Sequence, residues 1–295
     1  MAALGANLGI ATTKFIAAGL TGSSSMLAEA IHSVADSGNQ VLLLIGGRRS
    51  LREATARHPF GYGRERYVYA FIVSVVLFTV GGLFAIYEGV HKLQNPEPIH
   101  SWQWVPVTVL VVSIGLEGFS FRTAVRESNP LRAGSGWAAF VRSARAPELP
   151  VVLLEDAAAL VGLVLALFGV GLTLITGNGV WDGVGTLCIG VLLVVVAVIL
   201  AIEMKSLLIG ESATGDQVEA IQAALLGGPE VERVIHLRTL HLGPDELLVG
   251  AKIAVAHDET AQAVARAIDA AEARIRAAVP IARVIYLEPD IYRSG

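Results

Sequence analysis

Long apolar stretches constrain this chain more than any other feature of its sequence. A helix needs about 20 mostly apolar residues to cross the hydrocarbon core of a bilayer. The sequence contains six candidates, at residues 6–20, 26–45, 67–90, 104–120, 150–175 and 181–204. Since 54 % of all residues are hydrophobic and only 16 % are charged, the sequence predicts a multi-pass integral membrane protein.

Arginine residues predict how these stretches are oriented, because Lys and Arg concentrate in short loops on the cytoplasmic side of a membrane. The loops after the second and fourth stretches contain Arg48, Arg49, Arg52, Arg57, Arg64, Arg66, Arg122, Arg126, Arg132, Arg142 and Arg145. The loops on the opposite side contain only Lys92. Both termini are therefore predicted to lie in the cytoplasm, with the cell membrane as the default location.

The sequence after the last apolar stretch has the pattern of a separate folded domain. Helical periodicity at residues 216–226 and 260–278 is interleaved with strand-like runs. These runs cover residues 234–241, 247–255 and 282–287. The order helix, strand, strand, helix, strand (αββαβ) predicts a compact α+β domain, ferredoxin-like or metallochaperone-like in topology.

The chain is thus predicted to have two domains. An all-α six-helix transmembrane domain occupies residues 1–210, and a small cytoplasmic α+β domain occupies residues 211–295. The net charge of -4 comes with no dominant basic cluster, so nothing favours a nucleic-acid partner. The single cysteine, Cys188, lies in an apolar run and cannot form an intrachain disulfide or a thiolate metal cage.

Three ionisable residues lie within the second apolar stretch. Glu29, His32 and Asp36 are spaced i, i+3 and i+7, which places them on one side of a helix. An ionisable group inside a span costs about 2.5 to 3.5 kcal/mol on insertion scales, so these residues are candidates for a functional site. His32 and Asp36 offer an imidazole and a carboxylate one turn apart, as two ligands of one metal ion do. The alternative is a polar stripe that joins helices by hydrogen bonds.

A second pair of ionisable residues lies in the fifth stretch. Glu155 and Asp156 stand in the apolar run of residues 151–159. Adjacent residues of a helix point about 100° apart, so one carboxylate can complete a site with the second stretch while the other faces another helix or a water-filled path. The sequence leaves open which of the two is the ligand. A bound dication would relieve the repulsion between these neighbouring anions.

Several longer segments resemble one family of membrane proteins. Residues 24–40 read SSMLAEAIHSVADSGNQ, residues 58–65 read HPFGYGRE and residues 207–211 read LLIGE. Together with the α+β tail, they resemble the cation diffusion facilitator family of metal transporters over nearly the whole chain. The resemblance is closest to the branch that contains animal zinc transporter nine.

The resemblance implies a set of metal ligands. The family holds metal with a His/Asp-x-x-x-Asp pair on the second span and a matching pair on the fifth, which correspond here to His32 and Asp36 and to Asp156. Val152 stands where many members have His or Asp, so Glu155 or water takes the place of the fourth ligand. Glu29, on the same stripe as His32, is a candidate for the proton path.

Other positions of the family are only partly preserved. His58 and His236 match positions that bind metal in some members, but Tyr62 and Lys252 stand in place of their usual partners. We therefore expect at most weak second metal sites at these histidines.

The resemblance also implies a homodimer, joined largely through the cytoplasmic domains, which serve dimerisation and regulation. Arg64 matches a basic position that forms a charged hinge with an acidic group after the last span, and Glu211 is the candidate partner. A solvated arginine in a basic loop is the equal alternative.

These observations predict a transporter of divalent transition-metal ions rather than an enzyme. Metal binds only to a neutral imidazole and to ionised carboxylates, so metal and protons compete for the same groups. We expect Zn²⁺ to leave the cytoplasm in exchange for protons, with Mn²⁺, Fe²⁺ or Co²⁺ as alternative cargoes and no permanently bound cofactor. The expected partners are metal ions, protons, the lipid bilayer and a second copy of the chain.

Two other functions agree with parts of the sequence. A non-transporting membrane metal sensor or scaffold explains the tail but leaves the intramembrane charges unexplained. A membrane-embedded metal-dependent hydrolase would use buried His, Asp and Glu to activate water. The sequence has no His-Glu-x-x-His motif and no evident Ser or Cys nucleophile beside a base, so the hydrolase is the weaker alternative.

Overall fold

The computed structural model describes residues 2–99, 102–132, 134, 136–256 and 259–292. The chain folds into two compact units. A helical unit comprises Met1–Gly47 and Val68–Lys205, and an α+β unit comprises Arg48–Tyr67 and Ser206–Gly295. The loop between the second and third apolar stretches thus belongs to the α+β unit.

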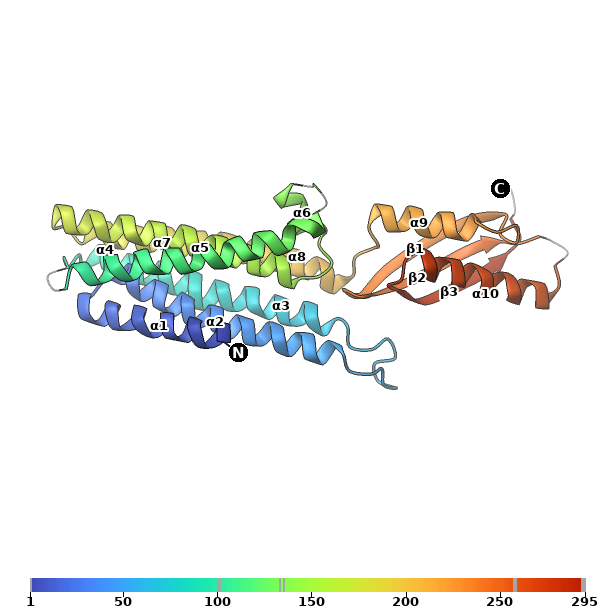
Figure 1. Cartoon of the computed structure of the whole chain (residues 1–295), viewed down its shortest axis with the longest axis horizontal. Helices are drawn as coiled ribbons and strands as arrows, with labels where there is room; N and C mark the ends of the chain where they lie inside the picture. Colours follow the sequence, from blue (N-terminus) through green and yellow to red (C-terminus); the bar gives the residue numbers. More distant parts are fainter. Residues whose placement is uncertain (1, 100–101, 133, 135, 257–258, 293–295) are drawn as a thin grey trace. The chain divides into compact units, whose positions relative to one another are not determined.

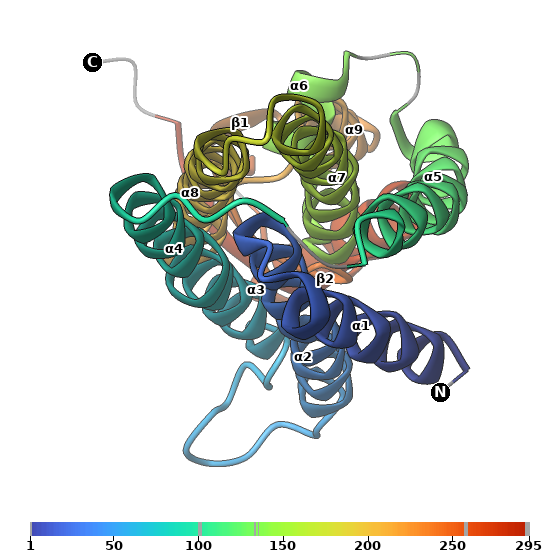
Figure 2. The same ribbon diagram turned by 90° about the vertical axis from the view of Figure 1, so that its left-hand side faces the viewer.

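The helical unit is a bundle of long helices (Figure 1). Its elements are α1 (Ala2–Thr21), α2 (Ser24–Ser50), α3 (Glu65–Val76), the π-helical segment η1 (Leu77–Leu83), α4 (Phe84–Gln94), α5 (Trp104–Arg132), α6 (Trp137–Ser143), α7 (Glu148–Thr176) and α8 (Val180–Ile209). Viewed along their axes, the long helices lie side by side (Figure 2). α5 packs on both α1 and α7, so the second half of the bundle is closed against the first helix.

Four helical segments in the described part of the chain are long and apolar enough to cross a bilayer. They are Glu65–Gln94, Trp104–Arg132, Glu148–Thr176 and Val180–Ile209. These segments coincide with the third to sixth apolar stretches of the sequence and support a membrane protein. α1 and α2 form in the expected places, but the buried polar side chains of α2 lower its hydropathy, so the count of six spans stays a prediction.

A carboxylate from another helix holds the start of α2. Asp182, in the first turn of α8, accepts hydrogen bonds from the backbone N–H groups of Ser24 and Ser25, at 2.7 and 3.2 Å. It also accepts a hydrogen bond of 2.9 Å from the Ser23 hydroxyl. The first N–H groups of a helix lack partners within the helix and favour an anionic acceptor. Asp182 therefore fixes where α2 begins and so positions its polar stripe within the bundle.

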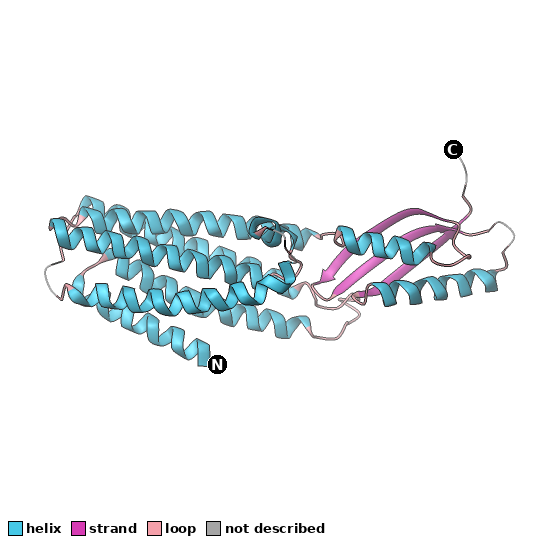
Figure 3. Cartoon of the chain, turned by 45° about the horizontal axis from the view of Figure 1, so that its top comes forward, coloured by secondary structure: helices cyan, strands magenta, loops and turns pink. Residues whose placement is uncertain are grey.

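The α+β unit contains, among its described residues, a three-stranded sheet and two helices (Figure 3). Its elements are α9 (Gly215–Leu226), β1 (Arg233–Gly243), β2 (Glu246–Ala254), α10 (Ala261–Ala278) and β3 (Ala282–Asp290). β1 pairs with β2 in antiparallel and β3 pairs with β2 in parallel orientation. The expected order of helices and strands is confirmed. α9 packs on β1, α10 on β3 and the two helices on each other, so both cover one face of the sheet.

The segment Arg48–Tyr67 contributes to this unit through contacts with the β1–β2 turn. Nη1 of Arg66 donates to Oδ2 of Asp245 at 2.8 Å. A Cβ at Gly63 would lie only 2.8 Å from the carbonyl oxygen of Leu242, so a residue without a side chain is needed at this close approach. The arginine-rich loop is therefore held by the C-terminal part of the chain.

We expect Asp182→Asn to destabilise the helical unit by about 1–3 kcal/mol, because one of the two acceptor oxygens is replaced by a donor facing backbone N–H groups. Thermal unfolding of the detergent-purified protein measures this as a lower Tm. Glu127→Gln removes an exposed carboxylate from α5 and serves as the control. An unchanged Tm for Asp182→Asn would show that α2 does not depend on this cap.

Candidate metal site

The polar stripe of α2 lies inside the helical bundle. Glu29 and His32 are 0 % and 1 % exposed, and the side chain of Asp36 is 14 % exposed. Nε2 of His32 is 3.5 Å from Oδ2 of Asp36, one turn further along the helix. The i, i+4 spacing thus brings an imidazole and a carboxylate together in a place shielded from solvent.

The adjacent acidic residues Glu155 and Asp156 of α7 face different helices. Glu155 faces α2, where Oε1 accepts a hydrogen bond of 2.6 Å from Nδ2 of Asn39 and where its carboxyl group lies within hydrogen-bonding reach of Asp36. Asp156 faces α5, where Oδ2 accepts a hydrogen bond of 2.9 Å from the hydroxyl of Ser120. The divergence expected for adjacent helical residues is present, and Glu155 is the one directed at the α2 pair.

Several polar atoms of this group have no hydrogen-bond partner among the described residues. They are Nδ1 and Nε2 of His32, Oδ1 of Asp36 and Oε1 of Glu29. Buried polar atoms are nearly always partnered, so this concentration of unpartnered atoms makes the region a candidate ligand-binding site. An imidazole with carboxylates is a donor set that suits Zn²⁺ and other divalent transition metals.

The candidate ligands are paired rather than gathered around one point. In the described residues, no three His, Cys, Asp or Glu side chains converge closely enough to hold a metal ion. His32 meets Asp36 and Asp36 meets Glu155, whereas Asp156 is engaged by Ser120. Side-chain rotations within α2 and α7 are therefore needed before these groups share one ion.

Lys14 is a charged neighbour of this stripe that the sequence analysis did not assign to the site. It lies in α1 and is 1 % exposed. Its Nζ donates to Oε2 of Glu29 at 3.1 Å and to the hydroxyl of Ser33 at 2.8 Å. The sequence did contain a signal for Lys14. It lies within the first apolar stretch, and an ionisable residue inside a span is a candidate for a functional site.

Glu117 of α5 is a second residue that the sequence analysis missed. Together with Ile10 of α1 and with Ser33 and Asp36 of α2, it lines a cavity of about 10 Å³, room for roughly one water. The same signal was available, because Glu117 stands in the fourth apolar stretch. The ionisable groups beside the polar stripe thus come from α1, α2, α5 and α7.

The two histidines considered for weak second sites belong to the α+β unit. The ring of His58 packs on that of Tyr62, with 4.8 Å between centroids. His236 of β1 is exposed and paired across the sheet with Lys252 of β2. The carboxylates of Asp290 and Glu288, 2.9 and 3.0 Å from Nζ of Lys252, raise the pKa of that lysine above its ordinary value. A metal ion beside His236 would face the ammonium group of Lys252. Weak metal binding at His236 stays a prediction, and so does weak binding at His58.

The proposed charged hinge also falls within the α+β unit. Nη2 of Arg64 lies 3.5 Å from the position that a Cβ of Gly210 would occupy. The next residue, Glu211, accepts a hydrogen bond of 2.9 Å at its backbone oxygen from the N–H of His241. Arg64 is thus adjacent to the segment that carries Glu211, and the ion pair itself stays a prediction.

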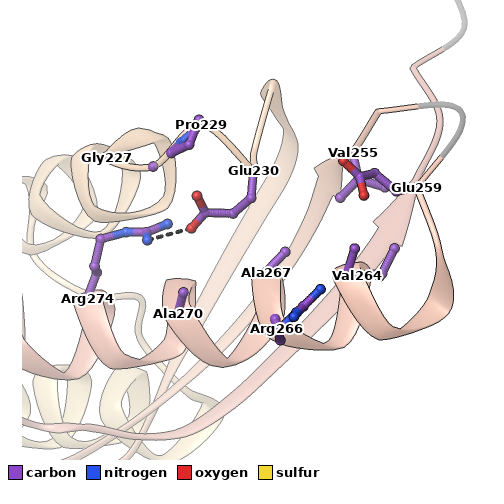
Figure 4. A pocket seen from close by; sticks show the side chains of 12 residues that line it. Gly227, Pro229, Glu230, Val255, Glu259, Val264, Arg266, Ala267, Ala270 and Arg274 are labelled. Atoms are coloured by element: carbon purple, nitrogen blue, oxygen red, sulfur yellow. Dashed lines mark ion pairs between the residues drawn. The ribbon is translucent and has the colours of Figure 1, made fainter.

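A pocket of about 470 Å³ in the α+β unit offers a different kind of surface (Figure 4). It lies between the turn at residues 227–230 and one side of α10, where Arg274 forms an ion pair with Glu230. The Glu230 carboxyl accepts a hydrogen bond from the backbone N–H of its own residue and another from Arg274, and both lower its pKa. No histidine or cysteine lines this pocket, so it does not have the chemistry of a transition-metal site.

Comparison with known proteins places this geometry in a family. Residues 1–209 match the cation efflux transmembrane domain, and residues 213–290 match the cytoplasmic domain of cation efflux proteins. The first match covers more than half of the chain, so the protein belongs to the cation efflux family. This confirms the resemblance drawn from its motifs and classes the chain with membrane transporters rather than with enzymes.

Individual relatives agree with this assignment. The chain is 36 % identical over 232 residues to the human "Proton-coupled zinc antiporter SLC30A9, mitochondrial", covering 78 % of this chain and 41 % of that protein. It is 30 % identical over 253 residues to "Metal tolerance protein C4" of Arabidopsis thaliana, covering 85 % and 55 %. It is 25 % identical over 285 residues to "Magnetosome protein MamB" of a Magnetospira strain, covering 92 % and 89 %. The chain thus spans less than half of the human relative's length.

We expect Asn39→Leu to weaken metal binding by roughly 10- to 100-fold, because losing an outer partner lets a ligand turn away. Asn39 is the donor that orients Glu155 toward Asp36. Equilibrium binding of Zn²⁺ to the detergent-purified protein measures the effect. Ser120→Ala is the matched comparison, since it releases Asp156 instead. A larger loss in Ser120→Ala than in Asn39→Leu would make Asp156 the ligand from α7.

Proposed function

We propose that the protein exports Zn²⁺ from the cytoplasm in exchange for protons. The observation that carries the proposal is the buried meeting of His32 and Asp36 on α2 with Glu155 on α7, in a chain of the cation efflux family. The name of the human relative, a proton-coupled zinc antiporter, supports both the cargo and the coupling ion.

The proposed ligands are His32, Asp36 and Glu155, with Asp156 as the alternative or additional ligand from α7. Three protein ligands and a water satisfy the four-coordinate preference of Zn²⁺. The combination of one imidazole with carboxylates also tolerates Mn²⁺, Fe²⁺ and Co²⁺. Val152, one turn before Asp156, supplies no donor atom, so the α7 side of the site depends on carboxylates alone.

Proton exchange follows from the chemistry of these groups. Metal binds the neutral imidazole and the ionised carboxylates, and protons bind the same atoms. A proton-loaded site therefore releases metal, and a metal-loaded site excludes protons. Glu29 is the proposed path for protons, because it is buried on the same side of α2, one turn before His32.

The membrane arrangement completes the proposal. We take six spans at residues 1–210 from the apolar stretches, and both termini are placed in the cytoplasm by the distribution of arginine. The cell membrane is the default location. Residues 211–295 are proposed to join two copies of the chain, which the match to the cytoplasmic domain of cation efflux proteins supports.

We expect Asp36→Asn and Glu155→Gln to reduce Zn²⁺ uptake into proteoliposomes by about 100-fold or more, since loss of even an outer partner costs roughly 10- to 100-fold. Asp156→Asn should retain more activity, because its carboxylate is turned toward Ser120. Mn²⁺, Fe²⁺ and Co²⁺ are offered in separate experiments. Glu127→Gln, which removes an exposed carboxylate from α5, is the control for loss of a carboxylate outside the site. Full transport by Asp36→Asn would refute the site, and no transport by the wild type would favour a metal sensor or scaffold.

We expect net Zn²⁺ transport to fall when the proton gradient is dissipated. Protons then no longer drive the return of the emptied site to the cytoplasmic side. Proteoliposomes loaded with a pH-sensitive dye report proton movement while a second dye reports Zn²⁺. Opposite and proportional movements of the two ions are expected. Zn²⁺ transport that continues unchanged without the gradient would contradict exchange with protons.

A further inference from the structure

Lys14 carries a positive charge in a buried position, where the loss of hydration costs free energy. Its ammonium group is almost fully buried within the bundle, and its partner Glu29 is 0 % exposed. Burying two charges gives little net stability even when they are well paired, because both lose their hydration. A pair of apolar residues would join α1 to α2 at lower cost, so cohesion of the helices is a poor explanation for this ion pair.

The ammonium group has bonding capacity left on the side of the metal site. It carries three N–H donors, and the bonds to Glu29 and Ser33 account for two of them. Ser33 also lines the small cavity that Asp36 and Glu117 share. The third donor can therefore turn toward that cavity while the ammonium group stays bonded to Glu29.

The charges around this cavity are strongly unbalanced. The ionisable groups that interact with Lys14 are its ion-pair partner Glu29 and the neighbouring Asp36, Glu117 and His32. When a dication leaves such a group, its carboxylates repel one another in surroundings of low dielectric constant. Protons can relieve part of this repulsion, and a cation attached to the protein can relieve another part without leaving the membrane.

We propose that Lys14 is a tethered counter-ion of the emptied transport site. On metal release its ammonium group turns into the cavity between Asp36 and Glu117 and stabilises the empty site while that site returns to load again. The proposal rests on the proposed transport function. It assigns Lys14 a positioning role in the return step and requires no change in its own charge.

The test compares two modes of transport. Exchange of Zn²⁺ for Zn²⁺ keeps the site occupied in both directions, whereas net proton-coupled transport needs the empty site to return. We expect Lys14→Gln, which keeps hydrogen bonding but removes the charge, to lower net transport by about tenfold or more and exchange by no more than about threefold. Lys14→Arg keeps the charge and should leave the ratio of the two rates near that of the wild type.

Lys92 provides a matched control, because it is another buried lysine of the same bundle and donates to the backbone oxygen of Gly22 at 2.9 Å. Lys92→Gln should change both rates alike. If Lys14→Gln left the ratio of net transport to exchange unchanged, the proposal would be overturned. An equal loss of both rates would then show that Lys14 serves only to hold the helices together.

Equilibrium binding separates failure of this proposal from failure of transport. Without the counter-ion, the carboxylates should hold the dication more tightly, so we expect Lys14→Gln to bind Zn²⁺ about tenfold more strongly than the wild type in detergent. This measurement applies even if the protein transports nothing. Equal or weaker binding by Lys14→Gln would contradict the counter-ion role.

Discussion

A buried ionisable group must find a partner, and this requirement determines how the helices of the bundle are joined. Asp182 of α8 binds the first turn of α2, and Lys14 of α1 binds Glu29 of α2. Glu155 of α7 bonds to α2, whereas its neighbour bonds to α5. Each contact joins two helices by polar groups within apolar surroundings. Around His32 and Asp36, by contrast, several buried polar atoms of the described residues lack a hydrogen-bond partner.

The metal-binding proposal and the polar contacts of the bundle depend on each other. Asn39 and Ser120 divide the two adjacent carboxylates of α7 between different neighbours. Without such donors, two anions side by side in an apolar helix would repel each other and turn unpredictably. Because each carboxylate has its own donor, only Glu155 faces the α2 pair. A site with few ligands can thus be oriented by residues that never touch the ion.

The sequence predicted whatever depends on the period of a single helix or strand. The spacing of Glu29, His32 and Asp36 predicted a common face, and alternation predicted the strands of the C-terminal sheet. What it left open depends on how helices are rotated against one another. That rotation decides that Glu155 rather than Asp156 faces α2, and it brings Lys14 and Glu117 beside the stripe. Asp182, at the start of its helix, likewise gave no local sign of its partner 158 residues away.

The carboxylate that holds the start of α2 also gives this helix a fixed end. At 1.5 Å per residue, His32 lies about 12 Å and Gly47 about 35 Å along the helix from Ser24. A tilt of α2 about Ser24 would therefore displace Gly47 about three times as far as His32. In such a tilt, residues near Ser24 would move least and residues near Gly47 would move most. An opening made this way would be wider at the end of α2 remote from Asp182 than at the candidate ligand His32.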